Sequence, residues 1–546
     1  MTPRQLALTL AAGLALADAS VVTLALPELL RELDTSVEGV AAVIGVYTVV
    51  LALALLPAER LMRARGPGAV GAAGFALFGL AGLLCGLADE LETLLAARAL
   101  QALGGAAGLV AAFALLTGGD DALRARRLWL GVAVLSAAVG PALGGALTQA
   151  FSWEAIFFAQ APLAGVAVLA CLGAPKPRPV SAARPKRSWA AGLALALVSA
   201  ALTAVLFLLV LLLVAGWGVE PLRAALTVSV LPLAALAGSR FGGPARTRAV
   251  AGCVLVGAGT MALAFLPGAS PGWTVLPQLL AGLGMGLALR AFSGELLPER
   301  DAADAARGLT LRHVGIAAAL LVLAPVTADR LDDATQRARE RGVALVLDAR
   351  LPPEDKLALA PELLAEVDAD EPRAGLRDAL ARQRDRYAPG TRERAELERL
   401  GARADDTLVA AVGESFLAAF VITGGLALAA AAVLLPRTPR PAWVLAAVLV
   451  GAGAVGATAV VEQRVAPEPV ALRDPCAERA LPGGSGVTGF LQDRALELLD
   501  RNACRLGSSR EEYVLALTDP DDAERFERRY GTDPRSTRGI LDALLG

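Results

Sequence analysis

The feature that constrains this chain most is a series of apolar runs, each about twenty residues long. Residues 5–30 and 189–216 are two examples, and Arg, Pro and Gly gather in the short segments between such runs. A helix of about twenty residues crosses a hydrocarbon core about 30 Å thick. Inside lipid the backbone polar groups must form hydrogen bonds within the chain, which only helices and closed β-barrels achieve. The sequence lacks the alternating apolar and polar residues of β-barrel strands. The runs are therefore predicted to be transmembrane helices.

Composition supports a membrane protein over a large soluble core. The chain is 55% hydrophobic with a mean hydropathy of +0.56, whereas soluble domains are about 45–50% apolar. The first run has no small-residue cleavage site, so it is interpreted as a span and not as a signal peptide. We predict thirteen spans, at residues 5–33, 39–59, 66–88, 92–117, 127–150, 153–173, 189–216, 222–240, 248–268, 272–296, 308–328, 409–436 and 441–461.

Basic residues in alternate loops predict the orientation. The loop after span 39–59 carries Arg60, Arg63 and Arg65, whereas the next short loop carries Asp89 and Glu90. Cytoplasmic loops hold the excess of Lys and Arg. The N-terminus is therefore expected in the cytoplasm, and an odd number of spans puts the C-terminus outside. A multi-pass protein of the plasma membrane follows.

A basic linker divides the spans into two groups, six before it and seven after it. The predicted organisation is an N-terminal six-helix half, the cytoplasmic linker, a C-terminal six-helix half with a helical insert outside the membrane, an extra transmembrane helix and a small outer domain. Their limits are 1–173, 174–188, 189–436 with the insert at 329–408, 437–462 and 463–546.

Several motifs in the first half have a defined order and spacing. Span 5–33 contains Asp18-Ala-Ser-Val-Val-Thr-Leu-Ala-Leu-Pro27, and span 92–117 begins with Arg98, Gln101 and Gly104 at fixed intervals. Span 127–150 carries a glycine series that includes Gly131, Gly140, Pro141, Gly144 and Gly145. The next span begins Trp153-Glu-Ala-Ile-Phe157-Phe158-Ala-Gln160-Ala-Pro162, and Arg312 and Gly315 stand in span 308–328.

Together these motifs resemble those of the major facilitator superfamily, most closely its drug:proton antiporters with fourteen spans. The resemblance implies an all-α membrane fold of two six-helix halves with a cavity between them. It also implies proton-coupled efflux of small amphipathic or hydrophobic compounds. In exporters of this family the span-five glycines form a seal between the halves, and the proline inside the glycine series favours that role over a generic packing face.

One loop departs from the family pattern. Where the family has G-x-x-x-D-R-x-G-R-R between spans two and three, this chain has Arg63 in place of the Asp and retains only Gly66 clearly. In the family this loop helps to set the conformational equilibrium. The departure supports an alternative function, a transporter-derived scaffold or sensor whose working parts are the two outer segments. Asp18, Arg98 and the span-five glycines, which match the family, argue against this alternative.

Asp18 and Arg98 are ionisable residues inside predicted spans, which makes them functional candidates. At 1.5 Å per residue, Asp18 lies about 20 Å from the cytoplasmic end of its span and Arg98 about 9 Å from the outer end of its own. In a core about 30 Å thick these depths nearly coincide. We therefore predict a buried Asp18–Arg98 pair, which either locks the two spans together or responds to protonation of Asp18.

Other polar residues give weaker signals. Glu414, near the outer end of span 409–436, either extends its carboxylate to the surface or takes part in proton release. His313 is the only histidine, and a cap or packing role is the simpler interpretation. The sequence has no metal-ligand cluster, no phosphate-binding G-x-x-x-x-G-K-[ST] loop and no evident nucleophile constellation. We expect no enzyme activity, no cofactor, no metal and no nucleic-acid partner.

The two outer segments carry their own signals. Cys476 and Cys504 both lie in the C-terminal segment, and a compartment outside the cytoplasm permits a disulfide between them. Beyond residue 488, Ser508 and Glu511 have capping-box spacing and Asp519 precedes a proline, so short helices are predicted. The insert is predicted to hold two or three helices that cover the outer mouth, recruit a protein partner or act as a solvated spacer. The expected partners of the whole chain are the bilayer, protons and a small-molecule substrate.

Overall fold

The computed structural model describes most of the chain as helix. It describes residues 2–536 apart from 119–124, 126–127, 130, 133–139, 141–142, 173–187, 365–373, 437, 440, 467–469, 478–480 and 483–485. Within these residues every regular element is a helix, which confirms the expected all-α class. The predicted linker 174–188 lies almost wholly outside the described residues. The chain forms two compact units: unit 1 is 1–215, 219–329 and 416–464, and unit 2 is 216–218, 330–415 and 465–546.

The N-terminal helices of unit 1 follow the predicted spans closely. They are α1 Pro3–Val22, the 3-10 turn η1 Thr23–Ala25, α2 Leu26–Glu32, α3 Val37–Arg65, α4 Pro67–Cys85, α5 Leu91–Thr117, α7 Glu154–Phe158 and α8 Gln160–Leu172. Span 5–33 is thus interrupted just before Pro27, whose ring removes a backbone donor. Gly66 separates α3 from α4 with a φ of 90°, a value that glycine adopts without strain.

The C-terminal helices of unit 1 show one further break and two π-helical turns. The elements are α9 Trp189–Leu211, the π-helical turn η2 Leu212–Gly216, α10 Pro221–Val228, α11 Val230–Gly238, α12 Ala245–Ala262, α13 Pro271–Ala291, the π-helical turn η3 Phe292–Leu296, α14 Ala302–Asp348, α17 Arg392–Leu434 and α18 Pro441–Val465. Span 222–240 breaks at Ser229, and spans 189–216 and 272–296 each end in a π-helical turn.

Ten helices in the described residues are long and apolar enough to cross a membrane by length and composition. Three of the thirteen predicted spans have no counterpart among them: 5–33, 127–150 and 248–268. Span 127–150 is described only in part. Helix α12 covers span 248–268 only as far as Ala262, and its first turn contains Arg246 and Arg248. The number thirteen stays a prediction.

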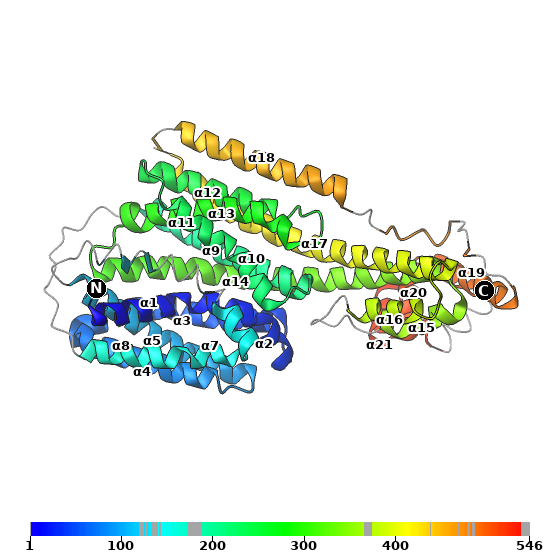
Figure 1. Cartoon of the computed structure of the whole chain (residues 1–546), viewed down its shortest axis with the longest axis horizontal. Helices are drawn as coiled ribbons and strands as arrows, with labels where there is room; N and C mark the ends of the chain where they lie inside the picture. The colour runs from blue at the N-terminus through cyan, green and yellow to red at the C-terminus, as the bar shows by residue number, and fades with distance from the viewer. Residues whose placement is uncertain are drawn as a thin grey trace. The chain divides into compact units, whose positions relative to one another are not determined.

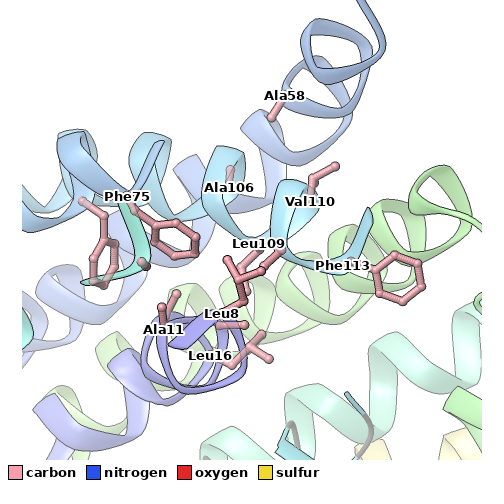
Figure 2. Close-up of a cluster of buried hydrophobic side chains, with 14 of the residues drawn as sticks. Leu8, Ala11, Leu16, Ala58, Phe75, Ala106, Leu109, Val110 and Phe113 are labelled. Atoms are coloured by element: carbon pink, nitrogen blue, oxygen red, sulfur yellow. The ribbon is translucent and has the colours of Figure 1, made fainter. Parts of the chain in front are cut away.

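Helices of the N-terminal half pack on one another. Contacts join α4 with α5, α3 with α5, α4 with α8 and α1 with both α5 and α8, and Figure 1 shows these helices side by side in blue and cyan. The core between them is almost entirely apolar. Figure 2 shows Leu8 and Leu16 of α1 facing Leu109 of α5, with Phe75 of α4 nearby. This dry packing surrounds the polar residues described below.

Two helices of unit 1 continue without interruption into unit 2. Span 308–328 is part of α14, 47 residues long, and span 409–436 is part of α17, 43 residues long. The predicted insert limits, 329 and 408, therefore do not coincide with helix ends. Between these helices lie α15 Pro353–Leu364 and α16 Ala374–Arg384.

Unit 2 combines the insert with the C-terminal segment, which the sequence treats as two separate parts. The insert core includes Leu345, Leu359 and Leu397, and Val470 of the C-terminal segment packs against it. The C-terminal helices are α19 Gly486–Leu506, α20 Arg510–Thr518 and α21 Pro520–Tyr530. An ion pair of 2.6 Å between Arg510 and Asp348 joins the two segments.

The start of α20 corrects a detail of the sequence analysis. Ser509, not Ser508, is the capping residue: its hydroxyl accepts a hydrogen bond from the Glu512 backbone N–H, and the Glu512 side chain accepts one in return. The prediction for α21 is confirmed, since the Asp519 side chain caps the helix that begins at Pro520.

Candidate functional site

Asp18 of α1 and Arg98 of α5 form an ion pair inside unit 1. Arg98 Nη1 donates to Asp18 Oδ2, and both side chains have 0% exposure. Burying a charge is costly unless it is paired and hydrogen-bonded. The structure therefore places these two residues together, as their matched depths predict.

Two glutamines complete a closed ring of hydrogen bonds with this pair. Arg98 Nη1 also donates to Gln101 Oε1 at 2.6 Å. Gln101 Nε2 donates to Gln160 Oε1 at 2.8 Å, and Gln160 Nε2 donates to Asp18 Oδ1 at 3.0 Å. All four side chains are buried. We call Asp18, Arg98, Gln101 and Gln160 the polar ring; it joins α1, α5 and α8.

Aromatic rings and backbone carbonyls enclose the guanidinium of Arg98. Its Cζ lies 4.4 Å from the ring centre of Tyr47 and 5.6 Å from that of Phe157. Its Nε donates to the carbonyl oxygen of Val43 at 3.2 Å. Nη2 is buried and has no hydrogen-bond partner among the described residues. Arg98 thus depends on one carboxylate for charge compensation, so loss of the Asp18 charge would leave a poorly compensated cation.

Gln160 and Tyr47 are members of this site that the sequence analysis did not single out as site residues. Gln160 stands in the motif of span 153–173 at the position where the family has Asn, which was the available signal. Tyr47 lies among apolar residues of α3, and its hydroxyl donates to the carbonyl oxygen of Ala15 at 2.9 Å. Nothing in the local sequence marks it.

The glycine series of span 127–150 is only partly brought together. A Cβ on Gly144 would lie 2.2 Å from the carbonyl oxygen of Val21, so this residue sits directly against the end of α1. Gly140 and Gly145 are buried, whereas Gly131 is exposed with open space around it. Pro141 lies outside the described residues.

The predicted motif of span 308–328 contributes to helix packing. A Cβ on Gly315 of α14 would lie 2.0 Å from the carbonyl oxygen of Ala196 of α9, so these two helices are in close contact. Arg312 is half-buried on the preceding turn. His313 Nδ1 lies 2.7 Å from the carbonyl oxygen of Leu309, an intrahelical contact.

Glu414 belongs to unit 2 and is not part of the polar ring. Its side chain is 47% exposed, and Oε1 lies 3.8 Å from Arg341 Nη1.

In the loop that departs from the family pattern, Arg63 pairs at 2.8 Å with Glu59, one helical turn earlier.

Cys476 and Cys504 are joined by a disulfide, with their Cα atoms 5.0 Å apart. It ties the chain before α19 to the last turn of that helix. Cys85, Cys171 and Cys253 are free and buried. The described residues contain no group of three or more His, Cys, Asp or Glu that could hold a metal ion.

Comparison with known proteins extends these observations. A sequence model of the family described as Major Facilitator Superfamily matches residues 8–320. The chain is 31% identical over 180 residues to the multidrug resistance protein Stp of Mycobacterium tuberculosis, covering 32% of this chain and 34% of that protein. It is 32% identical over 170 residues to the cephamycin export protein CmcT of Amycolatopsis lactamdurans, covering 30% and 35%. The match thus spans about a third of the length of these relatives.

A solved structure supports the same fold. A bacterial homologue of the human lysosomal transporter Spinster, in an inward-facing and occupied conformation, superposes with a TM-score of 0.54 at 17% identity. The superposition covers 79% of this chain and 95% of that one. At this identity the comparison shows the fold alone.

Proposed function

The chain belongs to the Major Facilitator Superfamily, and from this premise we propose that it is a secondary transporter that exports small amphipathic or hydrophobic compounds in exchange for protons. Family membership confirms the resemblance inferred from the motifs, and it places the chain among membrane transporters and not among enzymes. It does not favour the alternative of a scaffold or sensor. The relatives named as resistance and export proteins support efflux as the direction of transport.

The polar ring is the observation that carries the proton-coupling part of the proposal. Asp18 is the only acid in the ring, and its two oxygens hold Arg98 and Gln160 in place. Protonating Asp18 would remove the charge that compensates Arg98 and weaken the bonds between α1, α5 and α8. A proton can therefore change the relative stability of two arrangements of these helices, which is what coupling requires. A purely structural lock is the competing role for the same pair.

Transport by alternating access would place the substrate between the two six-helix halves. The predicted topology puts the N-terminus in the cytoplasm of a cell whose plasma membrane holds the protein. Gly144, seated against Val21, would maintain the helix contact near the ring. Unit 2 would lie outside, where the Cys476–Cys504 disulfide is stable.

The test uses purified protein in proteoliposomes with an imposed proton gradient. Uptake of ethidium and a panel of amphipathic antibiotics is recorded together with proton movement by an internal pH dye. We expect substrate-stimulated proton flux in the wild type, and Asp18→Asn should abolish it while the protein still folds. Asp34→Asn is the matched control, because it removes an exposed carboxylate at the end of the same segment.

Two results would contradict the proposal. Coupled export that persists in Asp18→Asn would remove the proton role and leave the pair structural. Absence of movement for every compound, in wild-type protein that is correctly folded, would favour the scaffold or sensor.

A further inference from the structure

Unit 2 contains a cavity of about 320 Å³ next to α14. Its lining consists of Arg337 and Arg341 of α14 and of Val470, Ala471 and Leu472 of the C-terminal segment. Its volume falls at the lower end of the range for small-ligand pockets, about 300–1,000 Å³. The lining therefore combines two cationic side chains with three apolar residues.

The two arginines have buried donors that the protein does not use. Within the described part of the chain, Arg337 Nε and Arg341 Nη1 are buried and have no hydrogen-bond partner. A buried donor without a partner is destabilising, and more so when it is charged. The two residues are also four apart on one helix, where like charges repel. An anion in the cavity would offset the repulsion between the two guanidinium charges.

Among the described residues, a carboxylate lies closer to the neighbouring arginine than to either of these two. Arg339, between them in sequence, lies 3.2 Å from Asp522. The acid that faces Arg341 is Glu414, whose oxygen is 3.8 Å away and whose side chain is half exposed. That distance is too long for a hydrogen bond. Arg337 has no ion pair within the described residues.

We propose that this cavity binds a small oxyanion, a phosphate or carboxylate group, attached to an apolar portion. The guanidinium fork matches the paired oxygens of such groups, and Arg binds them with charge-assisted hydrogen bonds. The apolar part of the ligand contacts Val470 and Leu472. Leu472 is 36% exposed, so it has surface to bury when a ligand binds. The cavity belongs to unit 2, whereas the polar ring belongs to unit 1.

The test is calorimetric titration of the full chain in phosphatidylcholine nanodiscs with butyl phosphate. We expect saturable binding, weaker binding of inorganic phosphate and no binding of butylammonium. Arg337→Gln and Arg341→Gln should each weaken butyl phosphate binding about tenfold or more, because each removes a charge-assisted donor. Arg399→Gln is the matched control, since Arg399 is an exposed residue of unit 2 paired with Glu396.

Glu414→Gln is a further test, in which the affinity for butyl phosphate is expected to rise instead of fall. Glu414 competes with the ligand for Arg341, so its neutralisation should tighten butyl phosphate binding several-fold. Thermal unfolding of each variant separates loss of the site from loss of the fold. Equal weakening by Arg399→Gln and Arg337→Gln, or no saturable binding by well-folded wild-type protein, would overturn the proposal.

A final titration distinguishes two sources of the anion. In nanodiscs that contain phosphatidylglycerol, a lipid headgroup that occupies the cavity would raise the apparent Kd for butyl phosphate in the wild type but not in Arg337→Gln. An unchanged Kd would identify a free soluble anion as the ligand. Both results assume that the cavity binds butyl phosphate, and they tell whether its natural occupant is a lipid headgroup or a soluble anion.

Discussion

Gln160 of α8 donates a hydrogen bond to Asp18 of α1 at 3.0 Å, so one amide connects two helices through a carboxylate that also pairs with Arg98. Hydrogen bonds to a charged group contribute about 1.5–3 kcal/mol. Gln160→Leu is therefore expected to destabilise the protein by about that amount, measured by thermal unfolding in detergent. In Asp18→Asn the same substitution should cost less, since the acceptor has lost its charge. Equal costs in both backgrounds would show that the bond does not depend on the carboxylate.

The Asp18–Arg98 pair should show strong non-additivity. Removing one partner of a buried pair leaves an uncompensated charge, which costs about 3–5 kcal/mol. Asp18→Asn alone should therefore destabilise the chain more than Asp18→Asn combined with Arg98→Gln. The double-mutant cycle measures the difference. An additive result would mean that the two charges do not interact.

Gly144 and Gly131 offer a matched pair of substitutions. Gly144→Ala would bring its Cβ to 2.2 Å from the Val21 carbonyl oxygen, whereas Gly131→Ala meets no atom within 4 Å. Overpacking costs about 1–3 kcal/mol, and a clash with backbone is difficult to relieve. We expect Gly144→Ala to lower the unfolding temperature and Gly131→Ala to leave it unchanged. Similar effects of the two variants would contradict the close contact.

Glu340 of α14 should make unit 2 less stable as the pH rises. Burial, followed by the nearby Glu512 carboxylate, raises the pKa of Glu340 from 4.5 to about 7. Between these values the unfolded chain has released the proton while the folded unit retains it. The stabilisation is thus complete below about pH 4.5 and is lost as the pH rises through 7.

Hydrogen exchange of the full chain at pH 5 and pH 7 checks this expectation. After correction for the intrinsic exchange rate, amides of 330–415 and 465–546 should be better protected at pH 5. Glu340→Gln should reduce the difference, because the amide does not titrate. Glu398→Gln, at an exposed position, serves as the control. A pH dependence that is the same in Glu340→Gln would assign it to other groups.

The Cys476–Cys504 disulfide closes a loop with a sequence separation of 28. Restricting the unfolded chain over such a loop stabilises a domain by about 3–4 kcal/mol. Cys476→Ser, Cys504→Ser and the double variant should therefore destabilise the C-terminal helices to a similar extent. Limited proteolysis of 465–546 and mass mapping without reductant provide the measurements. A free thiol at either position in the wild-type protein would contradict the pairing.

The polar ring shows how far sequence reasoning extends. Residue depth along two spans was enough to match Asp18 with Arg98, because each helix rises by a fixed distance per residue. It did not identify Gln160 as a partner of Asp18, since that contact depends on how α8 is rotated against α1. Tyr47 was not identified either, because an aromatic residue in an apolar helix has no distinguishing sequence pattern.

Helix limits were harder to predict than helix positions. Hydropathy marks where a span leaves lipid, but it does not mark where the helix ends. Arg, Glu and Ala beyond residue 329 are good helix formers, so α14 continues to Asp348. The same holds for α17, which begins well before the apolar run. The joining of insert and C-terminal segment in unit 2 depends on long-range pairs such as Arg510 with Asp348, which no local pattern encodes.

The polar ring has a direction, because its donors run from Arg98 through Gln101 and Gln160 to Asp18. A proton on Asp18 Oδ1 that points at Gln160 would place a donor opposite the Gln160 amide N–H. Gln160 would have to rotate by half a turn to accept it, and Gln101 would have to follow. The sequence of rotations stops at Arg98, whose guanidinium has no acceptor to offer. The donor order of the ring therefore matches an ionised Asp18, whose two oxygens both accept, and a proton aimed from Oδ1 at Gln160 would open the ring at one bond.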